Sequence, residues 1–109
     1  MFLQTYNAHV LAITDFSLYS IGLILTRLEK DGVFEDFLSD TLEDSGIMKI
    51  CLVNSDLIHL LSIRQRYQLD FDDAYQYTAA EKHDLAIVSF DNDFDQTELG
   101  RLTPGQATA

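Results

Sequence analysis

The sequence predicts an α/β domain of three layers, in which helices cover both faces of a central parallel sheet. Two short runs, Ile47–Val53 and Leu85–Phe90, are almost continuously apolar, as strands are when both of their faces are buried. Between these runs, apolar residues recur with helical spacing. Helices that alternate with buried strands are typical of this architecture. The 109 residues allow one domain, which we place at 1–104, followed by a flexible tail at 105–109.

The N-terminal half is expected to contain one strand and two helices. Ala8–Thr14 is short and apolar, which favours a buried strand. Asp15 or Ser17 can then cap a helix that runs to about Lys30. Its apolar positions have helical spacing: Leu18, Ile21, Gly22, Leu25 and Leu28. A second helix follows, with an apolar face formed by Val33, Phe34, Phe37, Leu38 and Leu42.

The C-terminal half is expected to contain two helices, both between the two apolar runs. Asn54 or Ser55 can cap the first, which should turn leucines inward and arginines toward water: Leu57, Leu60 and Leu61 against Arg64 and Arg66. The second helix opens at Leu69–Asp73 and has a buried face made by Phe71, Ala74, Tyr75, Thr78 and Ala79. Leu102–Pro104 is a candidate for a last short strand.

Composition narrows the class of protein. The net charge is −11, from 18 acidic and 7 basic residues, which argues against nucleic-acid binding by a basic surface. An acidic chain suits a cluster of carboxylates around a divalent cation, a basic partner, or simple solubility. The one cysteine, Cys51, lies in an apolar run and is predicted to be a buried thiol, which fits a reducing cytoplasm. We expect no signal peptide and no membrane span.

Two groups of acids are the candidate functional residues. Asp70, Asp72 and Asp73 lie where a helix begins, so they can cap it and stabilise its dipole, or one of them can bind a metal ion. Asp91, Asp93 and Asp95 follow a buried strand, where they form either a solvated turn or part of a cation site.

The second acidic group superficially matches a calcium-binding EF-hand loop. The match fails because Gln96 and Leu102 stand where that loop needs glycine and glutamate. In a parallel sheet, ligands bind at the carboxyl ends of the strands. A right-handed connection could therefore bring the two acidic groups to one edge.

The stretch Leu69–Asp95 closely resembles the C-terminal half of PIN-domain ribonucleases, notably toxins of the VapC type. In that family an Asp-Ala pair opens a helix, followed by a small-residue face, an apolar strand and a T/S-x-D-x-D-F motif. The matching residues here are Asp73-Ala74, Ala79-Ala80, Leu85–Phe90 and Ser89–Phe94. Residues Ile13–Leu25 also resemble the strand-to-helix passage in the middle of the family fold.

The resemblance implies metal-dependent cleavage of RNA. In such an enzyme, carboxylates hold Mg²⁺ or Mn²⁺, and the metal activates water for in-line attack on the phosphodiester. Asp73 and Asp91 match the late catalytic acids of the family, Asp93 lies close by, and Asp72 is a further candidate ligand. An antitoxin protein and a homodimer or strand-exchanged oligomer are the partners that the resemblance implies.

The chain departs from the family pattern at its N-terminus. The family begins with an apolar strand that ends in an Asp, and nothing before Ala8 resembles it. Ser20 stands where the family usually has a glutamate, so half of the acidic quartet is missing. As an alternative, Asp15 itself is the first-strand aspartate. The missing strand leaves three outcomes: a fragmentary gene product, a rearrangement of residues 1–13 that fills the gap, or a strand donated by a second chain.

Three functions therefore remain open. The first is a VapC-like endoribonuclease of a toxin–antitoxin pair, with activity doubtful in this short form. The second is a catalytically inactive PIN-like module that binds other proteins. The third is an acidic α/β domain with only convergent likeness to the family.

Overall fold

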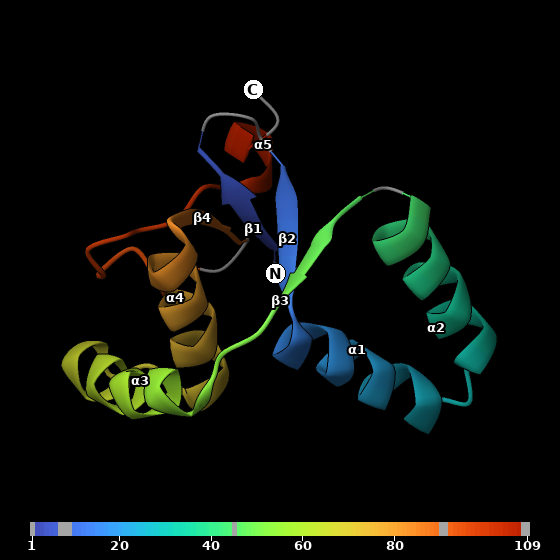
Figure 1. The fold of residues 1–109 in the computed structure, drawn as a ribbon, viewed down its shortest axis with the longest axis horizontal. Helices are drawn as coiled ribbons and strands as arrows, with labels where there is room; N and C mark the ends of the chain where they lie inside the picture. The colour runs from blue at the N-terminus through green and yellow to red at the C-terminus, as the bar shows by residue number, and fades with distance from the viewer. Residues whose placement is uncertain (1, 7–9, 45, 90–91, 108–109) are drawn as a thin grey trace.

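A computed structural model describes residues 2–6, 10–44, 46–89 and 92–107 (Figure 1). The elements in chain order are β1 (Phe2–Thr5), β2 (Leu11–Thr14), α1 (Asp15–Arg27), α2 (Asp31–Leu38), the π-helical turn η1 (Ser39–Asp44), β3 (Met48–Ile50), α3 (Asn54–Tyr67), α4 (Phe71–His83), β4 (Leu85–Val88) and α5 (Pro104–Ala107). The predicted class is confirmed, because a four-stranded sheet is flanked by helices.

The sheet has the order β3-β2-β1-β4. Strands β2 and β3 are parallel, whereas β1 is antiparallel to both β2 and β4. Consequently β2, β3 and β4 run in one direction and β1 runs in the other. The carboxyl ends of β2 and β4 therefore lie at the same edge of the sheet, as parallel strands require.

Strand β1 occupies the centre of the sheet, where sequence analysis found no strand. Leu3 pairs with Ala12 of β2 and with Ile87 of β4, and all three side chains are buried. Sequence analysis left three outcomes for the missing first strand of the family fold. The structure corresponds to the one in which the first residues of the chain rearrange to take its place. The strand was missed because it has only four residues and two of them, Gln4 and Thr5, are polar.

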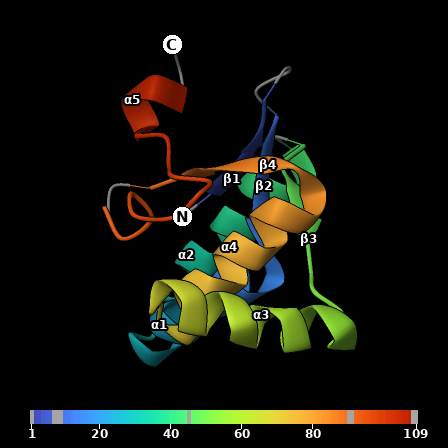
Figure 2. The same ribbon diagram turned by 90° about the vertical axis from the view of Figure 1, so that its left-hand side faces the viewer.

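Helices α3 and α4 pack against each other beside β4 (Figures 1 and 2). Seven consecutive residues of α4, from Ala74 to Ala80, are buried, so the helix is enclosed on every side rather than on the one predicted face. Phe71, which was predicted on that face, is exposed. Ala74, Tyr75, Ala79 and Ala80 belong to the main hydrophobic core with Leu3, Ala12, Leu60, Ile63, Leu69, Tyr77, Leu85, Ile87 and Phe94.

Helices α1 and α2 form a hairpin on the opposite side of the view (Figure 1). Thr14, rather than Asp15 or Ser17, caps α1, and its hydroxyl oxygen accepts a hydrogen bond from the Ser17 N–H at 3.1 Å. The two helices approach closely where the ring of Phe34 lies over Gly22. A Cβ atom at Gly22 would lie 2.6 Å from that ring, so the close approach requires glycine. Helix α2 buries none of its eight residues.

Further predictions about burial were wrong at β3, at Cys51 and on α3. Strand β3 was predicted to be buried on both faces, but it is a three-residue edge strand and Met48 is exposed. Cys51, just beyond β3, is exposed for the same reason. On α3 only Leu60 of the three predicted leucines is buried, because α4 covers a single face of that helix and leaves Leu57 and Leu61 in solvent.

The C-terminal region contributes one bridge and one helical turn. Leu102 forms a parallel bridge with Val88, so the predicted last strand is reduced to a single pairing. Residues 105–107, expected to be tail, belong to the short helix α5, and residues 108–109 lie outside the described residues.

Candidate metal-binding site

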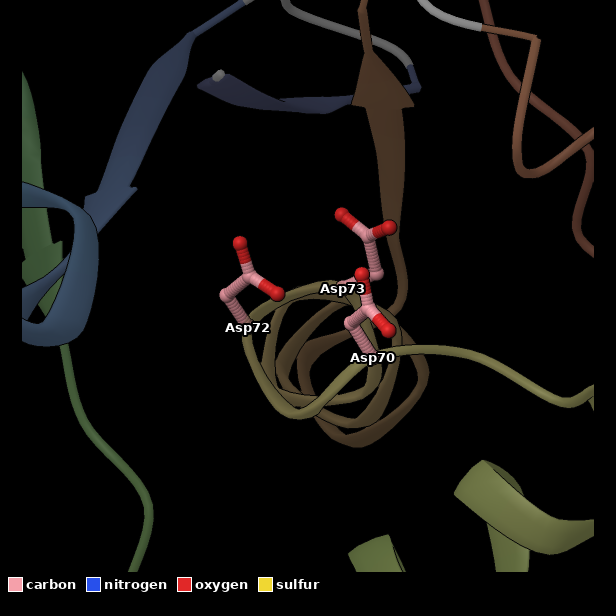
Figure 3. A group of neighbouring side chains, drawn as sticks. All are labelled: Asp70, Asp72 and Asp73. Carbon is pink, nitrogen blue, oxygen red and sulfur yellow. The ribbon is translucent and has the colours of Figure 1, made fainter.

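Three carboxylates gather at the N-terminus of α4 (Figure 3). The side chains of Asp70, Asp72 and Asp73 each offer an oxygen atom, and these atoms lie within 4.8 Å of one another. Asp70 has the extended backbone of an N-cap residue, but its side chain makes no capping hydrogen bond with the helix. The capping interpretation required this carboxylate to accept a hydrogen bond from an N–H of the first turn. Because it does not, the carboxylate is available to join Asp72 and Asp73.

The segment after β4 brings a fourth acid to this group. Phe94 is fully buried in the core and anchors a tight turn, in which the Asp95 N–H donates to the Asn92 carbonyl oxygen at 3.1 Å. This anchor places Asp93 beside Asp73, and the two residues line the same pocket. Asp95, in contrast, forms an ion pair with Arg101 at 2.9 Å.

Crowding at this place changes the chemistry of Asp73. Partial burial, followed by repulsion from Asp72, Asp93 and Asp70, raises the pKa of the Asp73 carboxyl from 3.8 to about 6. The hydrogen bond with Asp93 also favours the protonated form. A divalent cation would relieve this repulsion, because it places positive charge between the carboxylates.

Pockets lie on both sides of Asp73. One, of about 220 Å³, lies between α1 and α4 and is lined by Phe16, Ser17, Ser20, Ile21, Asp72, Asp73 and Gln76. The other, of about 140 Å³, is lined by Gln68, Leu69, Asp70, Asp73, Asp93 and Gln96. The acid group thus stands between two openings, so that a chain-like ligand could pass across it.

The structure brings together three of the four predicted site residues, Asp72, Asp73 and Asp93. The fourth, Asp91, lies outside the described residues. Asp15, the alternative first-strand aspartate, lies apart from the group of three acids and accepts a hydrogen bond from the Tyr75 hydroxyl at 2.7 Å. Ser20 does line the first pocket, at the place where the family glutamate was expected.

The sequence placed Asp70 in the first acidic group, as a cap or as a metal ligand, but the ligands inferred from the family resemblance did not include it, and only the structure distinguishes the two roles. Gln76 was not predicted as a site residue. Gln76 follows Asp72 by four residues and Asp73 by three, so it shares their face of α4. The other inward residues of this helix are apolar or small, so a glutamine among them was a signal that could have indicated Gln76 as a site residue.

The donor set fits a hard divalent cation. Every candidate ligand atom is a carboxylate oxygen, and Mg²⁺ and Mn²⁺ prefer oxygen ligands over nitrogen or sulfur. Two or three carboxylates also suffice for Mg²⁺, which keeps several of its water molecules in protein sites. The acids at the start of α4 and after β4 therefore suit such an ion by both charge and chemistry.

The family model of the PIN domain matches residues 2–99 of the chain. Neither the curated proteins nor the solved structures contain a significant match. In the part of the chain that the structure describes, no helix is long and apolar enough to cross a membrane. PIN domains are in general nucleases that use divalent metal ions and bind RNA, and they often act with antitoxins or as oligomers. Because the match covers most of its length, the chain belongs to the PIN-domain family.

Proposed function

We propose that this chain is a metal-dependent endoribonuclease and the toxin of a VapC-like toxin–antitoxin pair. The observation that carries the proposal is the crowding of carboxylates around Asp73, which raises the pKa of that group to about 6. Carboxylates whose pKa values are shifted by crowding cluster at functional sites. The sequence resemblance across Leu69–Phe94 points to the same chemistry.

The carboxylates would act as metal ligands, with Asp73 and Asp91 as the principal pair and Asp72 and Asp93 beside them. The bound Mg²⁺ or Mn²⁺ supplies an activated water and neutralises charge on the phosphodiester. Asp73 is mostly ionised above its pKa of about 6, so at neutral pH it can bind the cation. Asp70 lies in the same group and can accept a hydrogen bond from a water molecule held there.

Cleavage of single-stranded RNA in the presence of Mg²⁺ or Mn²⁺ tests this function. We expect cleavage by the unaltered chain and a loss of at least about 100-fold in the Asp73→Asn variant, because removal of a metal ligand removes the activated water. Asp36→Asn is the matched control, since Asp36 is an exposed acid on α2, away from the site. Absence of cleavage with both ions would reject an active nuclease.

A second function is favoured by a separate observation, which is the amount of apolar surface on the helices. The exposed apolar side chains include Tyr19, Leu23 and Ile24 on α1, Leu28 directly after α1, Val33 on α2, and Leu57, Ile58 and Leu61 on α3. Large exposed apolar patches are typical of protein–protein interfaces. The chain would then be a catalytically inactive PIN-like module, with an antitoxin or a second copy of itself as the partner.

The two functions are separated by a double variant in which Asp73 and Asp91 are both replaced by Asn. Retained binding to a partner or retained self-association, together with no RNA cleavage by the unaltered chain, would support the inactive module. A cytoplasmic location is part of both proposals, because the exposed thiol of Cys51 has no partner cysteine and suits a reducing compartment.

A further inference from the structure

A pocket of about 480 Å³ lies where the end of α3 meets the segment after β4. It is lined by Arg66, Tyr67, Gln68 and Gln96, and we call it the Arg66 pocket. Two hydrogen bonds join its walls, because Gln96 Nε2 donates to the Tyr67 carbonyl oxygen at 3.1 Å and the Glu98 N–H donates to the Tyr67 hydroxyl at 3.4 Å. Contacts between residues about 30 positions apart in the chain therefore build this pocket.

The Arg66 pocket adjoins the acid group. Gln68 and Gln96 also line the smaller pocket that contains Asp70, Asp73 and Asp93. Asp73 in turn lines the pocket between α1 and α4. The three pockets thus share residues one after another, so a chain-like ligand that crosses the acid group toward the end of α3 would next enter the Arg66 pocket.

Arg66 supplies positive charge beside the acids. Among the described residues that line the three pockets, it is the only basic one. Its guanidinium carbon lies over the Tyr67 ring, 5.0 Å from the ring centre, and Tyr67 itself packs on the buried Tyr77 with 5.2 Å between the ring centroids. A guanidinium held over an aromatic ring keeps N–H groups available at its edge, where they can bind the oxygens of a phosphate.

The one ion pair of Arg66 within the described part of the chain leaves this charge available. Its partner is Glu98, and the 3.8 Å between Nη2 and Oε2 is too long for a hydrogen bond. The two side chains are 63% and 76% exposed, and ion pairs between exposed groups contribute little to stability. A phosphate can therefore replace Glu98, because it accepts shorter, charge-assisted hydrogen bonds from the guanidinium.

We propose that the Arg66 pocket is a phosphate subsite for RNA, in which Arg66 binds the backbone phosphate of a nucleotide that flanks the cleaved bond. The side-chain amide of Gln68 would donate a further hydrogen bond to this phosphate. The inference rests on the proposed ribonuclease function and specifies the path of the strand. Because the acids repel every phosphate that no metal ion bridges, the arginine beside them directs the strand toward the end of α3.

NMR titration of the full chain with a short single-stranded RNA tests the subsite in EDTA, where no metal-dependent cleavage occurs. We expect the Nε–H resonance of Arg66 and the side-chain amide of Gln68 to shift. Arg66→Gln should weaken binding about tenfold, because a charged hydrogen bond to the phosphate is lost. It should also reduce the slope of log K against log salt concentration by about 0.7, since one fewer counterion is released.

Arg64→Gln is the matched control. Arg64 is an exposed residue of the same helix, its replacement changes the net charge equally, and it does not line the pocket. We expect this variant to weaken binding by no more than about twofold and to leave the salt slope unchanged. Polyglutamate is the control ligand, and it should not shift the pocket resonances if the site selects a nucleic-acid strand.

Three results would overturn the subsite: no shift of the pocket resonances with RNA, equal losses in Arg66→Gln and Arg64→Gln, or equal shifts with polyglutamate, which would indicate a site for an acidic protein segment. Failure of the proposed function has a different signature. RNA cleavage with an unchanged KM in Arg66→Gln would reject the subsite and leave the nuclease function standing. Arg66-dependent binding by a chain that cleaves no RNA would support the subsite and reject the nuclease function.

Discussion

Helices α4 and α1 represent two ways in which this chain uses apolar residues. Helix α4 is enclosed on all sides, with seven consecutive buried residues. Helix α1 buries only Leu18 and Gly22 of its thirteen residues, although most of its side chains are apolar. The difference indicates that the α3–α4–β4 region carries the stability of the domain and fixes the carboxylates, whereas the outer surface of α1 is available to a partner.

The largest expected effect is the loss of stability when a tyrosine of α4 is replaced by alanine, compared with the same substitution in α1. Tyr77→Ala in α4 removes a side chain that is 1% exposed, and should lower the free energy of unfolding by about 3–5 kcal/mol. Tyr19→Ala in α1 removes one that is 60% exposed and should change it by about 0.5 kcal/mol or less. Urea denaturation measures both values. Similar losses in the two variants would contradict the comparison.

An intermediate effect is expected where the two helices meet. Thr14 caps α1 and also accepts a hydrogen bond from Gln76 of α4. Thr14→Val keeps the shape but removes both interactions, and should cost about 1–2 kcal/mol. Thr26→Val is the matched control, because the Thr26 hydroxyl bonds only to carbonyls of its own helix and its loss should cost about 0.5 kcal/mol or less. A smaller loss for Thr14→Val than for Thr26→Val would show that this connection does not stabilise the domain.

The smallest expected effect is a gain in stability rather than a loss, and it concerns Asp73. Its pKa is about 6 in the folded chain and 3.8 in the unfolded chain, so the folded state holds its proton more tightly. Between these two pH values the folded state binds more protons, and its stability therefore falls as the pH rises. Asp73→Asn should remove this slope and stabilise the metal-free chain above pH 6 by about 1 kcal/mol, a value reduced because the side chain is only partly buried.

Thermal denaturation at a series of pH values from 4 to 8, without divalent ions, checks the Asp73 prediction. A lower melting temperature for Asp73→Asn at pH 7 would mean that the carboxylate stabilises the fold, which is not expected of a crowded metal ligand.

Sequence alone predicted the region that is densely packed. The α4 helix, the β4 strand and the closeness of Asp73 to Asp93 follow from helical spacing, an apolar run and strand direction, and all of these signals are local. The sequence predicted the sheet edge less well. Strand β1 has only four residues, and its place in the sheet depends on pairing with β2 and β4, which no local pattern reveals.

The site could be predicted only in part for the same reason. Carboxylate positions follow from their motifs, but whether Asp70 caps α4 or joins the acid group depends on the direction of one side chain. The orientation of Gln76 depends on Thr14 and Ser17, which lie about 60 residues earlier in the chain. Burial of Cys51 and β3 was overestimated because an apolar composition does not distinguish a central strand from an edge strand.

Isothermal titration calorimetry with Mn²⁺ tests the central claim that the acids of α4 and of the segment after β4 form one metal site. We expect binding at one site, loss of that binding in both Asp73→Asn and Asp91→Asn, and unchanged binding in Asp36→Asn. No binding by the unaltered chain, or binding that survives both substitutions, would contradict the claim.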